Sequence, residues 1–320
     1  MSSKSPFKSV LYNKSVTILI KYPTSREGGY TVPDGVASIN DVAFYGSTGL
    51  TSVALPNSLT SISRGTFNGC SSLAEVNIPN SVTSIGESAF ARCYSLTGII
   101  IPDSVTSIGE SAFNGCRNLT VVNIPDSVTS ISKFAFANSG LINVYIPGSV
   151  ATIGDRAFSY CDSLASINVA SDNPGYASVD GVLYNKSVTI LIQYPTSRKG
   201  GYTVPDGVTS VNDFAFCQSS GLTGVTFPKS LTSIGHSAFF RCSSLSQIVI
   251  PKNVTIIGTR AFQKCGGLYD VYFESATPPH ASDYTFMEVR PGARALVPID
   301  STGYGQSGSL WCRLIVTLSA

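Results

Sequence analysis

Hydrophobic and polar residues follow one fixed pattern along most of the chain. In residues 73–93 the apolar positions are spaced L-x-x-V-x-I, then V-x-x-I, then A-F and C. The first spacing is typical of a short, half-buried strand, and Pro79 ends it because proline cannot donate a ladder hydrogen bond. Eight apolar positions in a 23-residue unit are too few for a core of their own. The pattern therefore predicts coils that bury these residues against one another.

The same unit recurs at steps of 22 or 23 residues, with one longer interval. A fixed period of this size predicts a solenoid of stacked coils, β-rich with short helical or turn segments, in which each apolar position forms a column. The aromatic column consists of Phe44, Phe67, Phe90, Phe113, Phe136, Phe158, Phe216, Phe239 and Phe262. The aliphatic column consists of Ile39, Ile62, Ile85, Ile108, Ile131, Ile153, Val211, Ile234 and Ile257.

The unit at residues 101–125, IPDSVTSIGESAFNGCRNLTVVNIP, resembles the repeat of the BspA-like leucine-rich repeat proteins of bacteria and some protists. The resemblance covers about 33–169 and 205–273. It implies a leucine-rich-repeat solenoid of 23-residue coils stacked into a curved rod, with strands on the concave face. It also implies non-enzymatic binding of protein partners, adhesin-like recognition of host or matrix surfaces, and a cell-surface or secreted location.

A second, longer duplication interrupts the repeat. The sequence VLYNKSVTILI-x-YPTSR-x-GGYTVP occurs at residues 10–33 and again, 172 positions later, at residues 182–205. Apolar runs around a polar Asn-Lys-Ser turn predict a β-hairpin in each copy. The hairpin is either a structural splice that keeps the coils in register or a protruding contact element.

These features predict one continuous domain with five segments. They are an N-terminal hairpin or partial repeat at 1–32, leucine-rich repeats at 33–169, a β-hairpin insertion at 170–204, leucine-rich repeats at 205–273, and a C-terminal cap at 274–320. Trp311 and Leu314 suit the cap, which covers the last apolar face. The N-terminal coil is expected to be uncovered, which makes end-to-end self-association through it a second kind of partner contact.

The charge balance argues against nucleic acid and membrane partners. Only 12% of residues are charged, the net charge is +2, and no run of Lys or Arg occurs, so nucleic-acid binding has little electrostatic support. No apolar stretch reaches the length of a membrane span, so we expect no membrane insertion. The opening residues, MSSKSPFKSVLYNK, lack the apolar core of a signal peptide, which leaves a cytoplasmic location open.

The residues that often carry chemistry have structural explanations in this chain. Six of the eight cysteines lie three positions after a repeat Phe, so they form one column, either of packed free thiols or of disulfides between neighbouring coils. Cys217 and Cys312 lie outside the column and are expected to be exposed. No zinc-ligand spacing, phosphate loop or catalytic triad is recognisable. We therefore predict no metal, no cofactor, no catalytic residue and no enzyme activity.

Two outward-facing columns of the L-x-x-V-x-I strand are the candidate contact surface. They mix polar residues with Tyr, Ile and Val, a composition typical of protein contact sites. Tyr145 and Tyr272 are the expected anchors, because Tyr provides contact area with little entropy to lose. A structural spacer or self-assembling scaffold within a surface repeat array is the alternative function. The candidate residues are Glu75, Asn77, Ile100, Asn123, Asn143, Tyr145, Asn168, Gln247, Val249, Asp270 and Tyr272.

Overall fold

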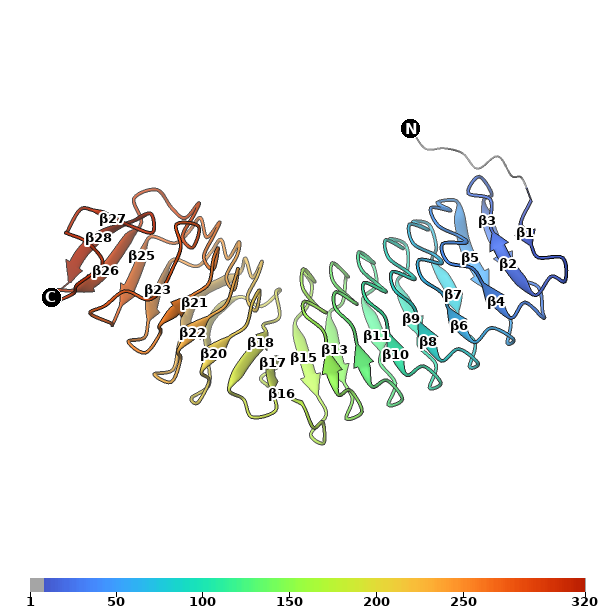
Figure 1. The fold of residues 1–320 in the computed structure, drawn as a ribbon, viewed down its shortest axis with the longest axis horizontal. Helices are drawn as coiled ribbons and strands as arrows, with labels where there is room; N and C mark the ends of the chain where they lie inside the picture. Colours follow the sequence, from blue (N-terminus) through green and yellow to red (C-terminus); the bar gives the residue numbers. More distant parts are fainter. Residues whose placement is uncertain (1–8, 320) are drawn as a thin grey trace. The chain divides into compact units, whose positions relative to one another are not determined.

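The computed structural model describes residues 9–319, and in this part of the chain the regular structure is strand and turn, without helix. The chain divides into two compact units, one of residues 9–163 and 169–175, the other of residues 164–168 and 176–319. Each unit is a β-solenoid of stacked coils (Figure 1). The solenoid prediction is confirmed, and the segments left open as helical or turn are turns. The division into five segments stays a prediction.

Each coil of unit 1 contributes one long and one short strand. The short strands pair in parallel at offsets of 22 or 23 residues, so equal positions of the repeat lie side by side. The hairpin and short strands are β1 Leu11–Tyr12, β2 Ile18–Lys21, β4 Ser38–Ile39, β6 Ser61–Ile62, β8 Ser84–Ile85, β10 Ser107–Ile108, β12 Ser130–Ile131 and β14 Thr152–Ile153. The long strands are β3 Gly28–Thr31, β5 Leu50–Ala54, β7 Glu75–Asn77, β9 Gly98–Ile100, β11 Val121–Asn123 and β13 Asn143–Ile146. β15, Ser166–Val169, lies where the two units divide.

The core of unit 1 consists of the predicted columns. Phe90 and Phe113 are fully buried, and their rings stack at 5.3 Å with an interplanar angle of 2°. Phe136 continues the stack at 5.2 Å from Phe113. The aliphatic column is buried in the same way, with Ile85 and Ile108 at 1% and 0% exposure. Both column predictions are therefore confirmed, and each coil depends on its neighbours for burial.

The cysteine column is made of free, buried thiols. Each thiol donates to the carbonyl oxygen of the repeat Phe in the preceding coil, for example Cys93 Sγ to Phe67 O at 3.2 Å and Cys116 Sγ to Phe90 O at 3.0 Å. The packed-thiol interpretation is confirmed. The expectation that Cys217 is exposed is wrong: its side chain is 1% exposed because the residue after the repeat Phe also faces the core in this coil. Cys312 is half-buried.

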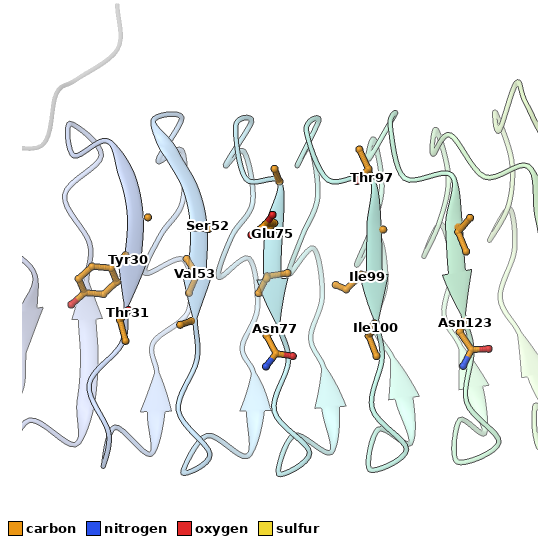
Figure 2. Close-up of a pocket in the computed structure, with 16 residues that line it drawn as sticks. Tyr30, Thr31, Ser52, Val53, Glu75, Asn77, Thr97, Ile99, Ile100 and Asn123 are labelled. Carbon is orange, nitrogen blue, oxygen red and sulfur yellow. The ribbon is translucent and has the colours of Figure 1, made fainter.

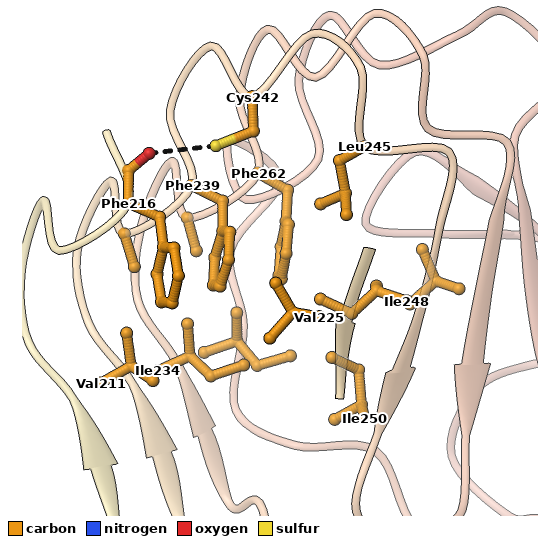
Figure 3. Close-up of a cluster of buried hydrophobic side chains, with 14 of the residues drawn as sticks. Val211, Phe216, Val225, Ile234, Phe239, Cys242, Leu245, Ile248, Ile250 and Phe262 are labelled. Atoms are coloured by element: carbon orange, nitrogen blue, oxygen red, sulfur yellow. Dashed lines mark hydrogen bonds between the residues drawn. The ribbon is translucent and has the colours of Figure 1, made fainter. Parts of the chain in front are cut away.

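Unit 2 repeats this arrangement with longer strand ladders. Figure 3 shows Phe216, Phe239 and Phe262 stacked in a row above Val211 and Ile234. Its strands are β16 Tyr176–Val179, β17 Val182–Asn185, β18 Ile190–Gln193, β19 Gly200–Thr203, β20 Ser210–Val211, β21 Leu222–Thr226, β22 Ser233–Ile234, β23 Gln247–Ile250, β24 Ile256–Ile257, β25 Asp270–Phe273, β26 Arg294–Pro298, β27 Leu310–Trp311 and β28 Leu314–Ser319.

The predicted hairpin is present in both copies. β17 and β18 pair antiparallel, and β18 then pairs in parallel with β20 of the next coil. β1, β2 and β4 have the same relationship in unit 1. One edge of the hairpin is thus built into the stack, which supports the structural-splice interpretation. The sequence pattern did not predict β16, which adds a third antiparallel strand to β17.

The C-terminal segment continues the solenoid before it caps it. Phe286 is fully buried and stacks on Phe262 at 5.1 Å, and β26 pairs in parallel with β25. The predicted repeats end at residue 273, and one further coil, 24 residues long and without the repeat sequence, follows them in the structure. Trp311 packs against Phe273 and Tyr304, as a residue of the cap should.

Candidate binding groove

The long strands of unit 1 present two rows of outward-facing side chains. β3, β5 and β7 pair in parallel, with Gly29 opposite Ser52 and Ser52 opposite Glu75. β9 and β11 pair with Gly98 opposite Val121 and Ile100 opposite Asn123. We define the upper row as Gly29, Ser52, Glu75, Gly98 and Val121, and the lower row as Thr31, Ala54, Asn77, Ile100 and Asn123.

A groove of about 830 Å³ runs across these strands. It exists because much of the upper row is small: the Cβ that Gly98 lacks would meet no atom within 4 Å. Tyr30, Val53, Val76 and Ile99 alternate with the two rows along their strands, so their side chains point to the opposite face, toward the core, and the strands themselves form the floor of the groove. Figure 2 shows Thr31, Asn77, Ile100 and Asn123 in line on β3, β7, β9 and β11, with Tyr30 at one end.

The strand ladder is interrupted within the groove. β7 ends one sheet and β9 begins another, although their coils follow each other in the stack. Val76 at this break is only half-buried, whereas the equivalent Val53 is 3% exposed. Part of the Val76 side chain is therefore accessible at the break between β7 and β9.

Glu75 is the one charged side chain among the groove-lining residues. Its carboxylate is exposed, and none of the ion pairs between residues 9 and 319 involves it. Tyr30 lines the groove, and Arg26 lies 5.0 Å from the centroid of its ring. The Tyr30 hydroxyl is hydrogen-bonded to Tyr12 Oη at 2.5 Å. Glu75 is thus available to a positive group of a bound molecule.

Ile100, the last residue of β9, and Val121, the first residue of β11, line the same groove as Glu75. They are 79% and 65% exposed, so the groove presents large apolar side chains to solvent. Asn77 and Asn123 flank Ile100 in the lower row and are exposed. Each carboxamide has two N–H donors and one carbonyl oxygen acceptor, so the two side chains can hydrogen-bond to a peptide backbone that crosses the strands.

The predicted contact residues fall into three groups. Glu75, Asn77, Ile100 and Asn123 line the groove. Asn143 and Tyr145 lie on β13, and Asn168 lies on β15; all three are exposed and outside the groove-lining set. The third group lies on the long strands of unit 2 and consists of Gln247, Val249, Asp270 and Tyr272.

Asp270 does not have the exposed side chain that we expected. It is 4% exposed, and the Arg294 guanidinium holds it with two hydrogen bonds, Nε to Oδ1 and Nη2 to Oδ2, each 2.8 Å. Arg294 comes from β26, in the coil that the sequence did not reveal. Asp270 therefore lies at an outward-facing position of its strand, but Arg294 covers its side chain. The same pairing raises the pKa of Arg294, because the carboxylate bonds to its charged form.

The two units differ where the groove lies. Residues 172 positions apart correspond, so Glu75 matches Gln247, Ile100 matches Tyr272, and Gly98 matches Asp270. In unit 2 the carboxylate of Asp270 and the side chain of Arg294 occupy positions where unit 1 has the open space above Gly98. Unit 2 thus provides matched positions for testing the groove.

Sequence reasoning missed part of the lining. The predicted set begins at Glu75, so it leaves out Tyr30, Thr31 and Ser52, which belong to the two long strands before it. Gly98 was in a column but carries no side chain to suggest a contact. The signal that could have found the groove is the run of small residues at equal repeat positions, Gly29, Ser52 and Gly98.

The described residues offer little for metal chemistry. No group of three or more His, Cys, Asp or Glu side chains within residues 9–319 could hold a metal ion. Nor does this span include a helix able to cross a membrane. The chemistry of the groove is therefore that of hydrogen bonds, one carboxylate and apolar contact.

Stacked coils with parallel strands and a buried aromatic column define a leucine-rich-repeat solenoid. The family model described as the BspA type leucine rich repeat region matches residues 29–103, 83–178 and 200–289, in six copies. The chain therefore belongs to the BspA-type leucine-rich repeat family. No curated protein matches the sequence.

Solved structures of similar proteins agree with this assignment. A leucine rich cell surface protein from Faecalibacterium prausnitzii A2-165 is 30% identical, with a TM-score of 0.79 over 95% of this chain and 83% of that one. A leucine-rich repeat protein from Eubacterium ventriosum is 26% identical, with a TM-score of 0.60 over 89% and 75%. The pneumococcal vaccine antigen PcpA, at 20% identity and a TM-score of 0.71 over 95% and 89%, shares the fold.

Proposed function

We propose that this protein is a non-catalytic binding protein, adhesin-like in its recognition of a protein partner, and that the groove of unit 1 is its contact site. The observation that carries the proposal is the groove itself, which is lined both by Glu75, a carboxylate outside every ion pair of residues 9–319, and by the exposed side chain of Ile100. The family assignment supports a protein-interaction role in general, and the groove supports a particular surface.

The partner that suits this groove is an extended protein segment with a basic residue close to an apolar one. The basic side chain pairs with Glu75, and the apolar side chain packs against Ile100 and the floor at Ile99. Asn77 and Asn123 hydrogen-bond to the backbone of the segment. Tyr145, 57% exposed on β13, extends the contact beyond the groove. In unit 2, Gln247, Val249 and Tyr272 form the corresponding surface without a carboxylate.

We also propose a cell-surface or secreted location, supported by the description of the F. prausnitzii relative as a cell surface protein. Antibody labelling of intact and permeabilised cells would check this. Labelling that requires permeabilisation would argue for an internal location instead.

A phage-displayed library of linear peptides, selected on the full chain, tests the groove. We expect enrichment of sequences in which Lys or Arg lies near a large apolar residue. Binding of selected peptides should fall about tenfold or more in Glu75→Gln and Ile100→Asp, because each change removes one of the two recognised features. Gly98→Leu should also weaken binding, since it fills the open space above Gly98 without adding a charge.

Matched changes in unit 2 are the controls. Gln247→Ala and Tyr272→Asp, at the positions that match Glu75 and Ile100, should leave peptide affinity unchanged. Peptides that bind wild type and Gly98→Leu equally, or a selection without basic and apolar residues together, would contradict the groove assignment. A loss confined to Tyr272→Ala would move the site to unit 2. Pull-down from matrix proteins with the same variants then identifies natural partners.

A structural spacer or self-assembling scaffold is the second candidate. Among residues 9–319, β1 pairs with β2 alone, which favours this candidate because an unpaired strand edge is a template for pairing. A spacer would enrich no peptide sequence in the library selection.

A further inference from the structure

An ion pair lies on the long strands of unit 2, which carry no other charge. In β19, β21, β23, β25, β26 and β28, Asp270 and Arg294 are the only charged residues. They lie opposite each other on β25 and β26, and Arg294 lies opposite Ile315 of β28 on its other side. Any charged group of a partner that reaches these strands therefore meets this pair.

The pairing uses only part of the Arg294 guanidinium. Nε and Nη2 each donate one hydrogen bond to the carboxylate of Asp270. A guanidinium has five N–H donors, so those of Nη1 and the second N–H of Nη2 remain, and they have no acceptor among residues 9–319. The side chain of Arg294 is 49% exposed, whereas Asp270 is almost fully buried. The buried carboxylate thus holds one edge of the guanidinium, and the other edge keeps its donors for a second acceptor.

Two tyrosines and a second arginine lie near Arg294. Tyr272 lies two residues beyond Asp270 on the same face of β25, and Tyr269 directly precedes Asp270. Both are exposed, and both are close enough to add, after the Asp270 carboxylate, to the rise in the pKa of Arg294. Arg290 is exposed and lies 5.8 Å from the centroid of the Tyr269 ring. With two guanidinium groups and one carboxylate, the cluster carries a net positive charge.

We propose that Arg294, flanked by Tyr269 and Tyr272, binds an acidic side chain of a protein partner. The free N–H groups of a guanidinium match the two oxygens of a carboxylate, which is the bidentate geometry that arginine favours. A protein suits the site because large apolar side chains, Val249 and Ile315, are partly exposed on the same long strands.

This site is separate from the groove and has the opposite charge preference. The positions of unit 1 that match Tyr269, Asp270 and Tyr272 hold Thr97, Gly98 and Ile100, so the groove has none of these groups. The exposed charge of the groove is the Glu75 carboxylate, whereas that of unit 2 is the Arg294 guanidinium. The proposal therefore does not rest on binding in the groove.

A phage-displayed library of linear peptides without Lys and Arg, selected on the full chain carrying Glu75→Gln, tests the site. We expect enrichment of Asp or Glu near an aromatic or apolar residue. Affinity for a selected peptide should fall about tenfold or more in Arg294→Lys, which keeps the charge but cannot hold Asp270 and a second carboxylate in bidentate geometry. Arg260→Lys is the matched control at an exposed arginine outside the strands. Tyr272→Ala should also weaken binding while leaving the ion pair intact, and circular dichroism checks that the variants fold.

A double-mutant cycle with the peptide separates recognition from a structural role of the ion pair. Replacing the acidic residue of the peptide by its amide should weaken binding to wild type about tenfold, but should change binding to Arg294→Lys much less. Equal losses on both chains, or a selection without acidic residues, would overturn the proposal. Arg294-dependent binding of an oligogalacturonate, with no acidic peptide enriched, would also overturn it, because that result assigns the site to an acidic polysaccharide. The acidic peptides should bind wild type and Glu75→Gln equally, whether or not the groove binds basic ones.

Discussion

The phenolic oxygens of Tyr184 and Tyr202 lie 2.6 Å apart, in a buried hydrogen bond that joins the hairpin to β19. The matching pair in unit 1, Tyr12 and Tyr30, is only partly buried. Burial and the bond to Tyr202 raise the pKa of Tyr184 above its ordinary value. The two pairs are thus the same contact in two different solvent environments.

We expect Tyr184→Phe to lower the free energy of unfolding by about 1 kcal/mol, because it leaves the Tyr202 hydroxyl without its partner. Tyr12→Phe should cost less, since water reaches its partner. The double variant Tyr184→Phe/Tyr202→Phe should cost less than the sum of its single changes, because no polar group is then left unpaired. Urea unfolding measures all three, and equal losses for Tyr12→Phe and Tyr184→Phe would contradict this account.

The aromatic column gives the largest predicted effect. Phe113 is fully buried between Phe90 and Phe136, so Phe113→Ala should cost about 3–5 kcal/mol through the cavity it leaves. Thermal unfolding should show a lower midpoint. Tyr94→Ala, at a residue that is 40% exposed, is the control and should change the midpoint little. An unchanged midpoint for Phe113→Ala would refute the stacked column.

The buried thiols make stability sensitive to alkaline pH. Desolvation raises the pKa of Cys116 from 9.0 to about 12. Above pH 9 the unfolded chain releases this proton while the folded chain keeps it, so the free energy of unfolding falls as pH rises. The stabilisation is complete below pH 9, and its loss approaches about 1.4 kcal/mol per pH unit for each such thiol.

Cys116→Ser tests this pH dependence, since Ser47 and Ser139 already occupy the same column. Between pH 9 and about 10, before tyrosines ionise, the variant should lose stability less steeply than wild type in urea unfolding. If the free energy of unfolding falls with pH at the same rate in both proteins, Cys116 does not contribute to the pH dependence. In a separate thiol titration of the native protein, only the half-buried Cys312 should react, and the column cysteines should react on unfolding.

The columns of the core were predictable because burial repeats with the period of the sequence. Phe90 and Phe113 occupy one column whatever the details of the turns between them. The covering of Asp270 was not predictable, because Arg294 belongs to a coil that lacks the repeat sequence. The groove was not predictable for another reason: it depends on space above Gly98, and a column shows which side chains are present rather than the volume between them.

Turn conformations are another feature that sequence periodicity did not reveal. Gly69, Arg92 and Gly115 occupy one repeat position and all have left-handed backbone, with φ of 77°, 60° and 79°. Gly115→Ala should therefore cost about 1–2 kcal/mol, and Arg92→Gly should be neutral or stabilising. Gly98→Ala is the control, because Gly98 has no positive φ and open space around it. Equal effects at Gly98 and Gly115 would contradict the role of backbone strain.

Six cysteine bonds each connect one coil to the coil before it, at sequence separations of 25 or 26 residues. A coil therefore closes a chain loop of the same length wherever it stands in the array. Contact order in absolute terms does not grow as coils are added, and the entropic cost of closing each new loop stays constant. Recombination that adds or removes whole 23-residue units can thus change the length of such a protein without making it harder to fold.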